Sequence, residues 1–375
     1  MKLALVVPGG VDASGERRVI PAVLSLVRRL ARRHEVHVFS LFHQREAGRW
    51  PLLGAEVHNP GGSSNLVCEW RALQAMRAEH RRAPFDVIQS LWGGPCGVAA
   101  VWAGRVLHRP VAVHLAGGEL AAVPDIGWGA ALSPWGRWRE RWVLRQAQAV
   151  TAASQPMLAL AAAVGVQAMR LPLGADADVW PITAPRPRKA NAPLRLVQVA
   201  SLNRVKDQPC LLRALALLRE QGVDAVLDLA GADTLGGEVQ RLAAQLGLAG
   251  AVRFHGELTQ AQLRPLVLVA DLHVITSRHE AGPLAVLEAA LCGVPSVGTA
   301  VGHLQEWAPH AARVVPPGDA LGLAGVLAEL ARDDVQRLAL AARAQAIARA
   351  EDADDTARRF EQLHEQLHQR LASGW

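Results

Sequence analysis

Two carboxylates, Glu280 and Glu288, stand in an otherwise apolar stretch, SRHEAGPLAVLEAALCGVP at residues 277–295, with seven residues between them. We expect Glu280 in a loop and Glu288 about two turns into a helix. Paired glycosidase acids lie roughly 5 to 9.5 Å apart across one bond, whereas eight helical residues span about 12 Å. The spacing therefore better suits two hydroxyl-bearing ends of one elongated ligand. The alternative is one solvated helical Glu and one loop Glu with no shared role.

The backbone predicted around these acids is a strand, a loop and a helix. DLHVITS, directly upstream, is typical of a short buried strand, and Gly282 followed by Pro283 favours a helix start because proline fits the first turn. Gly293 can close the helix in the left-handed conformation. The helix N-terminus, at Gly282, Pro283 and Leu284, offers free N–H groups and a dipole that favour a phosphate. An acid, an anion site and another acid in a row would suit a sugar, its diphosphate and a ribose.

A basic loop, VASLNRVKDQP at residues 199–209, follows another predicted strand. It contains Ser201, Arg204 and Lys206, and Asp207 can cap the helix that comes next. Two cations in this loop could neutralise a diphosphate leaving group. The alternative is a solvated basic loop.

Strands and helices alternate along nearly the whole chain, which is typical of parallel sheets covered on both faces. The sequence predicts an α/β protein of two doubly wound, Rossmann-like domains that face a central cleft, with ligands at the C-terminal ends of strands. We expect an N-terminal domain over 1–180, a proline-rich, basic linker over 176–193 and a C-terminal domain over 194–354. The final helix, 355–375, is expected to pack back on the first domain. The segments predicted as strands are KLALVV, EVHVFSL, FDVIQSL, PVAVHLA, QAVTAA, LRLVQVAS, DAVLDLAG, AVRFHG, LHVITS, PSVGTA and ARVVPP.

Composition limits the remaining possibilities. Half of the 375 residues are hydrophobic, yet no apolar run approaches the roughly 20 residues of a membrane span. The opening MKLALVVPGG favours a first strand over a signal peptide, so we expect a cytoplasmic protein. The four cysteines have no metal-like spacing and are expected to be buried free thiols.

Taken together, the segments SLNRVKD, FHGEL, ADLHVITSRHEAGPLAVLEAALCGVPSV and VGHLQEW resemble the group 1 (family 4) glycosyltransferases of the GT-B fold. The resemblance spans nearly the whole chain, and its most specific part is the pair of glutamates separated by seven residues. It implies a nucleotide-sugar donor held mainly by the C-terminal domain and transfer with retention of anomeric configuration. It also implies that Glu280 contacts donor-sugar hydroxyls, that Glu288 contacts the ribose, and that Gly256 of FHGEL lies at the donor.

The N-terminal domain matches the family less sharply. VVPGGVDASGERR resembles the family's glycine-rich first loop, so that Gly9 and Gly10 would allow close approach to donor or acceptor. His114, at the end of the fourth predicted strand, stands where the family often has a histidine lining the donor-sugar pocket, and the alternative is a core histidine. The sequence also departs from the family: Ser201 replaces a common arginine, which leaves Arg204 as a substitute, and Pro283 lacks an N–H that relatives offer.

No metal and no cofactor are expected beyond the nucleotide-diphosphate sugar, which is a co-substrate. The resemblance implies front-face attack assisted by the leaving diphosphate, so positioning and charge stabilisation carry the catalysis. The Asp-Ala-Asp sequence at 176–178 mimics a metal motif of another glycosyltransferase fold but falls in a turn before the linker.

Charge favours acidic partners, because 40 Lys and Arg face 34 Asp and Glu and the sequence pI is near 9.8. No nucleic-acid-binding motif accompanies this charge, so we expect no nucleic-acid partner. The basic segments are 23–34 and 133–146, and the second interleaves arginines with Trp135, Trp138 and Trp142 on one helical face. Tryptophan beside arginine suits an anionic membrane surface, and the alternative is that this face packs inside the domain.

The sequence therefore predicts a retaining, metal-independent hexosyltransferase-type enzyme that moves a sugar from a nucleotide sugar to an acceptor hydroxyl. The acceptor is expected to be a sugar or a lipid-linked glycan, as in cell-surface polysaccharide or glycolipid synthesis, and the enzyme could sit on the inner face of the plasma membrane. Two alternatives stay open: a sugar-nucleotide epimerase of the same architecture, and a non-catalytic donor-binding partner subunit.

Overall fold

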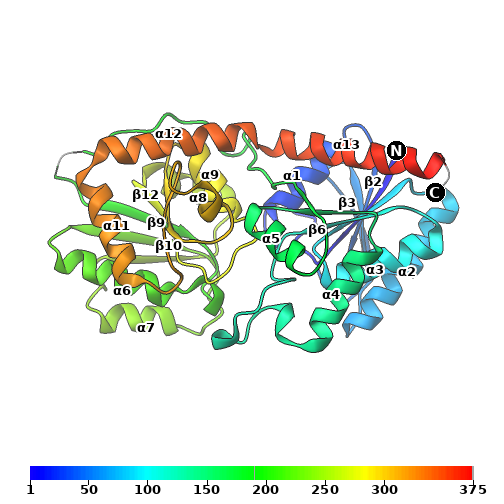
Figure 1. The fold of residues 1–375 in the computed structure, drawn as a ribbon, viewed down its shortest axis with the longest axis horizontal. Coiled ribbons are helices and arrows are strands. Elements are labelled where there is room, and N and C mark those ends of the chain that lie inside the picture. The colour runs from blue at the N-terminus through cyan, green and yellow to red at the C-terminus, as the bar shows by residue number, and fades with distance from the viewer. Residues whose placement is uncertain (190, 374–375) are drawn as a thin grey trace. The chain divides into compact units, whose positions relative to one another are not determined.

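The computed structural model describes residues 1–189 and 191–373, which form two compact units (Figure 1). Unit 1 comprises Met1–Leu173 together with the C-terminal segment that begins at Ala353, and unit 2 comprises Gly174–Asp352. The C-terminal helix thus belongs to unit 1. The boundary lies a few residues before the expected one at 180. None of the described helices is long and apolar enough to cross a membrane.

An eight-stranded sheet forms the centre of unit 1, in the order β3-β4-β2-β1-β5-β6-β7-β8. Neighbouring strands are parallel, except that β3 runs antiparallel to β4 at the edge. The first strand lies centrally, with Leu3 paired to Val36 on one side and to Val87 on the other. The strands are β1 (Lys2–Val7), β2 (Glu35–Ser40), β3 (Gly48–Leu52), β4 (Ala55–Asn59), β5 (Val87–Leu91), β6 (Val111–Leu115), β7 (Ala149–Ala152) and β8 (Met169–Arg170).

Helices cover both faces of this sheet. Figure 1 shows α2, α3 and α4 in one layer, in which α3 contacts both α2 and α4, while α1 and α13 pack together on the other side. The helices are α1 (Pro21–Leu30), α2 (Asn65–Arg82), α3 (Gly94–Leu107), α4 (Pro134–Gln146), α5 (Gln155–Ala163) and α13 (Ala353–Ala372), with short 3-10 turns η1 (Pro124–Ile126) and η2 (Ala130–Leu132).

Unit 2 contains a fully parallel six-stranded sheet in the order β11-β10-β9-β12-β13-β14. The chain builds outward from β9 in one direction and then restarts at β12 in the other, so the strand order reverses between β9 and β12. The strands are β9 (Leu194–Val199), β10 (Ala225–Ala230), β11 (Val252–Gly256), β12 (Leu272–Ile275), β13 (Ser296–Thr299) and β14 (Arg313–Val315).

The sheet of unit 2 has an apolar core on each face because successive side chains of a strand point to opposite sides. In β9, Leu196 belongs to one buried cluster and Val197 to the other. The helices that supply the rest of these cores are α6 (Gln208–Glu220), α7 (Glu238–Gln245), α8 (Gln260–Val269), α9 (Leu284–Leu291), α10 (Gly302–Trp307), α11 (Ala320–Arg332) and α12 (Asp334–Ala350), with the 3-10 turn η3 (Arg204–Lys206).

The segment expected as a linker is held against unit 2 rather than free. Trp180 is fully buried, and the Thr183 N–H donates to the Leu291 carbonyl oxygen. Arg186 donates to the carbonyl oxygens at the end of α8, including that of Ala270 at 3.0 Å. Proline and charge give this stretch no helical or strand periodicity, yet its side chains anchor it.

Each strand predicted from the sequence is present. The strands not predicted are β3, β4 and β8. In β3, Gly48 and Pro51 break the usual strand composition, and the proline is tolerated because this is the edge strand.

Strands β12 and β13 of unit 2 approach each other so closely at Gly298 that there is no room for a side chain. A Cβ at this position would lie 1.7 Å from the Ile275 carbonyl oxygen of β12, and the glycine has a positive φ of 153°. We expect Gly298→Ala to lower the free energy of unfolding by about 3 kcal/mol or more. The matched control is Gly325→Ala in α11, where a Cβ meets nothing within 4 Å and helix propensity predicts a gain of about 1 kcal/mol. Calorimetric unfolding of both variants measures the difference, and an unchanged transition for Gly298→Ala would contradict this packing.

Candidate functional site

The candidate site lies where the strand order of unit 2 reverses. Because β9 and β12 are adjacent and parallel, the loops after them, 200–207 and 276–283, leave the same edge of the sheet. Ligands in doubly wound sheets bind at such a point. The structure brings two predicted residues together here: Lys206 Nζ lies 2.5 Å from Glu280 Oε1, and both side chains are largely buried.

Backbone and side-chain bonds fix these two loops to each other. Asn203 accepts a bond from the Lys206 N–H at 3.1 Å, and the Thr276 hydroxyl donates to the Lys206 carbonyl oxygen at 2.9 Å. The Arg278 N–H donates to the Val205 carbonyl oxygen at 2.7 Å. As predicted, Asp207 caps α6 by accepting from the Cys210 N–H. The lysine is therefore presented on a short, well-anchored turn.

Glu280 is positioned from two further directions. The Ser277 hydroxyl donates to Glu280 Oε1 at 2.6 Å, and the Thr299 hydroxyl holds the Ser277 carbonyl oxygen at 2.7 Å. Gly302, the first residue of α10, approaches so closely that a Cβ would lie 2.8 Å from Pro283 Cδ and 3.2 Å from Glu280 Cβ. Sequence analysis noted the VGHLQEW segment but missed that its glycine is needed for this contact.

Helix α9 begins at Leu284, four residues after Glu280 and one residue later than predicted. Pro283 occupies the N-cap position rather than the first turn, and it brings no side-chain hydrogen bond to the helix end. Gly282 and Leu284 are partly exposed at the same turn. The N-terminal N–H groups and dipole of α9 therefore favour an anion beside the Lys206 ammonium.

Glu288 lies in the second turn of α9, closer to the helix start than expected, and only 6% of its surface is exposed. Gln260 Nε2 donates to its Oε1 at 3.2 Å. Burial raises the pKa of Glu288 to about 7, and the Gln260 amide and the Trp180 indole oppose that rise only in part. Burying a carboxyl group this deeply costs stability. A carboxyl group with such a shifted pKa is therefore a candidate functional residue. Gln260, from the start of α8, is a neighbour that sequence analysis did not identify.

The other predicted donor residues of unit 2 are more exposed. Arg204 extends away into solvent, with its nearest carboxylate, Glu238, 4.0 Å away. Ser201 is exposed, and its carbonyl oxygen accepts from Gln208 Nε2 at 3.1 Å. Gly256 has φ 67° with open space around its Cβ position. The structure thus joins Lys206 to Glu280 but shows no contact between Arg204 and that pair.

In unit 1, the two predicted loop glycines shape the turn after β1. Gly10 has φ 73°, and a Cβ there would strike Ile20, whose N–H donates to the Gly10 carbonyl oxygen at 2.9 Å. Gly9 makes only ordinary van der Waals approaches to the backbone of His43. Gly10 is therefore needed for the path of the loop itself.

His114 packs in the core of unit 1 rather than lining an open pocket. Its ring is fully buried, lies 5.6 Å from the Phe360 ring of α13, and bonds through Nδ1 to the Thr151 hydroxyl at 2.9 Å. Burial lowers the pKa of His114 to about 3, so the ring is neutral at physiological pH. This burial agrees with the alternative of a core histidine, because β6 has a neighbouring strand on each side and all five of its residues are buried.

Two buried acids that sequence analysis missed organise the strand ends of unit 1. Glu119 accepts backbone N–H bonds from Gly93 at 3.2 Å and Gly117 at 2.8 Å, and Glu140 accepts from Gly94 at 2.9 Å. Burial raises the pKa of both carboxyl groups. They hold the loops after β5 and β6 in place. The signal in the sequence was an acid within the glycine-rich turn AGGEL.

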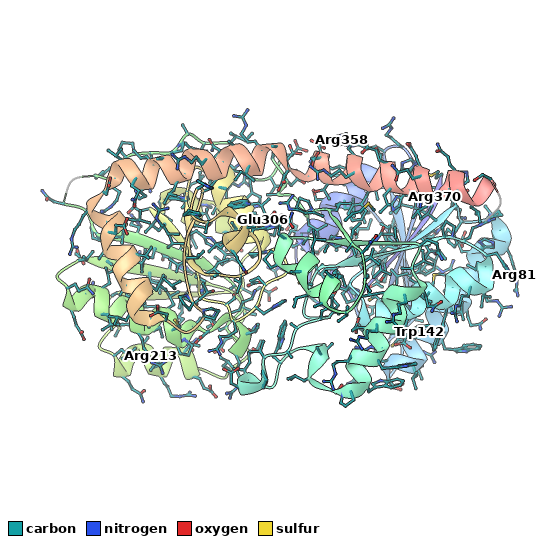
Figure 2. All side chains as sticks on the ribbon, in the orientation of Figure 1. Arg81, Trp142, Arg213, Glu306, Arg358 and Arg370 are labelled. Carbon is teal, nitrogen blue, oxygen red and sulfur yellow. The ribbon has the colours of Figure 1, made fainter. Side chains whose placement is uncertain are left out.

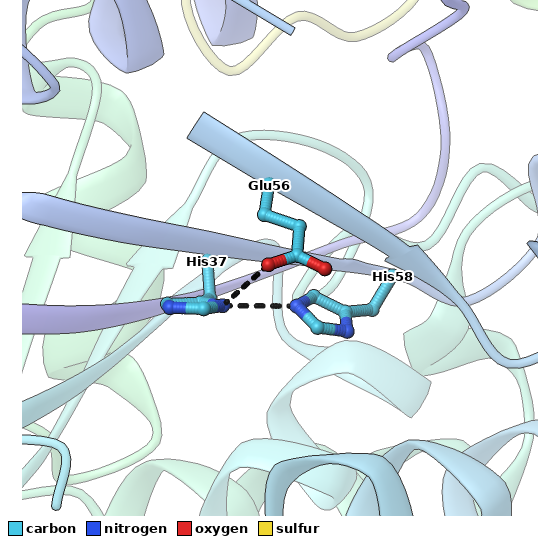
Figure 3. A group of neighbouring side chains, drawn as sticks. All are labelled: His37, Glu56 and His58. Carbon is cyan, nitrogen blue, oxygen red and sulfur yellow. Dashed lines mark hydrogen bonds and ion pairs between the residues drawn. The ribbon is translucent and has the colours of Figure 1, made fainter. Parts of the chain in front are cut away.

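Among the described residues of unit 1, two groups of side chains have residue types that could hold a metal, and both include His37: one is His37, Glu56 and His58, and the other is Glu35, His37 and Glu79. Figure 3 shows His37, Glu56 and His58 on β2 and β4, with His37 Nδ1 2.9 Å from His58 Nε2 and 4.0 Å from Glu56 Oε2. The other His37 nitrogen bonds to Glu35 at 3.0 Å, and the Arg49 guanidinium lies 3.7 Å from Glu56. A hydrogen-bonded chain from Glu35 through both rings accounts for this geometry. None of the predicted donor residues takes part in it.

The Asp-Ala-Asp sequence near the start of unit 2 forms a turn. Asp176 accepts the Asp178 N–H at 3.1 Å, and its carbonyl oxygen accepts the N–H groups of Val179 and Trp180. This turn leads Trp180 into the core.

Comparison with known families agrees with both units. Residues 183–350 match the family described as "Glycosyl transferases group 1", and residues 19–174 match the "Glycosyl transferase 4-like domain". The D-inositol 3-phosphate glycosyltransferase of Xylanimonas cellulosilytica is 28% identical over 395 residues, which cover 93% of this chain and 91% of that protein. The glycogen synthase of Mycobacterium tuberculosis is 34% identical over 174 residues, covering 45% of this chain and 42% of that protein. The match to the latter thus spans less than half of its length.

Solved structures share the fold over nearly the whole chain. Sucrose-phosphate synthase from Thermosynechococcus elongatus superposes with a TM-score of 0.80 at 19% identity, covering 98% of this chain and 99% of that one. Anabaena HepE, solved in complex with UDP and glucose, gives a TM-score of 0.75 at 19% identity, covering 98% and 100%. Two matched domains and two Rossmann-like sheets confirm the predicted fold class. The chain therefore belongs to the group 1, family 4 glycosyltransferases, and it has the GT-B fold.

Proposed function

We propose that this glycosyltransferase moves a sugar from a nucleotide-diphosphate sugar to an acceptor hydroxyl with retention of anomeric configuration and without a metal. The observation that carries the proposal is the Lys206–Glu280 ion pair at the strand-order reversal of unit 2, beside the N-terminus of α9. Glu288 lies one turn along that helix. This order of groups matches the order of sugar, diphosphate and ribose in a donor.

Each group has a defined task in this proposal. The Lys206 ammonium and the α9 N-terminus stabilise the diphosphate as negative charge develops on it. Glu280 accepts hydrogen bonds from donor-sugar hydroxyls, for which it must exchange part of its contact with Lys206. Glu288, deprotonated on binding, accepts the ribose hydroxyls. Charged hydrogen bonds of this kind contribute about 1.5–3 kcal/mol each.

The transfer balances without a protein nucleophile. The bond between the anomeric carbon and the diphosphate oxygen breaks, and a bond from the acceptor oxygen to the same carbon forms on the same face. The acceptor's hydroxyl proton passes to the departing diphosphate. The protein's part is to hold the acceptor hydroxyl on the same face of the donor sugar as the leaving diphosphate and to stabilise charge. We assign acceptor binding to unit 1, and a lipid-linked or cell-surface glycan is the acceptor class we favour.

A direct test begins with ligand binding and ends with product stereochemistry. A thermal-shift screen of nucleoside diphosphates and nucleotide sugars identifies the donor, because a ligand that binds only the folded state raises the Tm. Proton NMR of the transferred sugar then gives its anomeric configuration. Turnover of the donor to an epimer without acceptor would support the epimerase alternative. Binding with neither transfer nor hydrolysis across an acceptor panel would support a partner subunit.

Glu280→Gln should lower kcat by about 10- to 100-fold while the donor KM changes less, since its bonds to the sugar matter most in the transition state. The control is Glu220→Gln, an exposed acid at the end of α6, which should leave both constants unchanged. Steady-state kinetics with the donor found in the screen provide the measurement. Wild-type kinetics in a folded Glu280→Gln variant would remove Glu280 from the site.

Glu288→Gln should stabilise the free protein at neutral pH while weakening donor binding. The pKa of Glu288 is about 7 in the folded chain against about 4.3 unfolded, so the wild type loses stability as pH rises from about 4 to 7. Above pH 7 the penalty is constant, at up to about 3 kcal/mol. The variant has no such penalty.

The expected result is therefore a Tm difference in favour of Glu288→Gln that is small at pH 4.5, grows to pH 7 and then levels off. Glu220→Gln again serves as the control and should show no pH-dependent difference. A variant less stable than wild type at pH 8 would mean that Glu288 is ionised and well satisfied in the free protein.

Lys206→Met should reduce kcat/KM by about 10- to 100-fold, because the ammonium provides the charge that a metal supplies elsewhere. Treatment of the wild type with EDTA should leave its activity intact. Loss of activity in EDTA with recovery on adding magnesium would overturn the cation-based part of the proposal.

A further inference from the structure

The outer face of the α2, α3 and α4 layer in unit 1 exposes large apolar side chains. Trp135 and Trp138 of α4 are 65% and 55% exposed, and Leu66 and Trp70 of α2 are 70% and 56% exposed. The three helices lie side by side (Figure 1). Contiguous exposed apolar side chains of this size mark an interaction surface. This outcome rejects the alternative that the tryptophan face of 133–146 packs inside the domain.

The tryptophans of α4 form a stacked ladder along the helix. The ring centroids of Trp135 and Trp138 are 4.9 Å apart, and those of Trp138 and Trp142 are 6.4 Å apart, with nearly parallel planes. Beside the ladder is an open, apolar slot of about 320 Å³. Its apolar lining consists of Leu66, Val98, Trp102, Trp135, Trp138 and Trp142. An apolar slot of this volume can take part of one hydrocarbon chain.

Charge around this face is of one sign. The acidic residues of α2, α3 and α4 are Glu69, Glu79 and Glu140, and each is buried. Burial also raises the pKa of Glu69 to about 7, which weakens its charge further. The exposed arginines of these helices are Arg71, Arg81, Arg82, Arg105, Arg137, Arg141 and Arg145, and Figure 2 marks Arg81 and Trp142 on this layer.

The other basic segment, 23–34, does not contribute to this surface. Arg29 is buried in an ion pair with Asp354 at 2.5 Å, and Arg33 pairs with Glu361 at 3.2 Å. Both acids belong to α13, and α1 with α13 covers the opposite face of the sheet. The expectation that both basic segments meet a membrane is therefore corrected to α2, α3 and α4.

We propose that the face formed by α2, α3 and α4 docks this protein on an anionic lipid bilayer. Trp135 and Trp138 lie at the boundary between headgroups and acyl chains, where an amphipathic indole is favoured. The slot receives part of one acyl chain, and Arg137, Arg141 and Arg145 contact lipid phosphates. Binding of this kind places α4 in the plane of the interface and is independent of the donor site in unit 2.

The charge pattern favours a bilayer over the other occupants of such a face. A second copy docking through the same face would bring arginines against arginines without an exposed acid to pair with them, since the acids of these helices are buried. An anionic bilayer offers lipid phosphates to the arginines wherever they lie along its surface. Each basic side chain near that surface adds to the attraction. A protein partner would need an acidic rim around an apolar centre, and the test includes that outcome.

Co-sedimentation with vesicles tests the proposal on the full chain. We expect binding to phosphatidylglycerol-containing vesicles at low salt, at least 10-fold weaker binding to pure phosphatidylcholine, and a steep decrease as salt rises. Trp135→Ser with Trp138→Ser should weaken binding at least 10-fold. Arg137, Arg141 and Arg145 changed together to Gln should abolish the preference for the anionic lipid.

The control variant carries Leu321→Ser and Val335→Ser, two exposed apolar residues of α11 and α12 in unit 2, and should bind vesicles as the wild type does. Thermal shift with the nucleotide ligand verifies that each variant is folded. Vesicles with brominated acyl chains should quench the wild-type tryptophan emission and quench the Trp135/Trp138 variant much less.

Three outcomes would overturn the proposal. One is equal or negligible binding to both kinds of vesicle at low salt. Another is vesicle binding that the tryptophan and arginine variants retain in full. The third is a concentration-dependent dimer, or capture of an acidic protein, that the tryptophan variant loses while vesicle binding is unchanged. None of these results bears on sugar transfer to a soluble acceptor, so failure here and failure of the donor-site proposal can be told apart.

Discussion

The pairing of β9 with β12 is the constraint on which the proposed donor site depends. Two strands far apart in the sequence become parallel neighbours, and only for that reason do the loops that follow them share an edge. The Lys206–Glu280 pair then joins these loops, helped by the bond from Thr276 to the Lys206 carbonyl oxygen. Opposite charges held together avoid the cost of two unpaired ions in a largely buried place. In the proposed function a donor replaces part of the contact between Lys206 and Glu280.

Much of the fold followed from local pattern, because a buried parallel strand is a short run of branched apolar residues between polar or glycine turns. β1, β9 and β12 have that pattern, whereas β3 contains Gly48 and Pro51 and is stabilised by antiparallel pairing with β4 rather than by its own composition. Residues 176–193 show what a local sequence pattern leaves out. Their proline and charge content predicts a linker, but burial of Trp180 is a tertiary effect that no local pattern records.

The placement of Lys206, Asp207 and Glu280 at strand ends was predictable, because local sequence pattern decides it. Placement was not predictable where burial decides it. His114 occupies a strand end, yet the helix that covers it, α13, comes from the far end of the chain. The burial of Arg29 was not predictable for the same reason, because its partner Asp354 is 325 residues away in the sequence. For α4, the spacing of the tryptophans predicts that they share one face of the helix. The spacing is the same whether that face packs against the protein core or is exposed to solvent.

The carboxyl groups of the chain show how burial separates structural from functional acids. Glu119 and Glu140 are buried and organise the loops at the strand ends of unit 1. Glu119 accepts from backbone N–H groups, and Glu140 accepts from the Gly94 N–H and from the Arg139 guanidinium. Glu288 is equally dry, yet the neighbours that stabilise its charged form are neutral, the Gln260 amide and the Trp180 indole, and burial raises its pKa to about 7. A helix residue that only packed would be an apolar one, as the flanking Leu287 and Ala289 are. In the proposed function this acid accepts hydrogen bonds from the ribose hydroxyls of the donor, and that gain on binding offsets the cost of keeping it buried in the free protein.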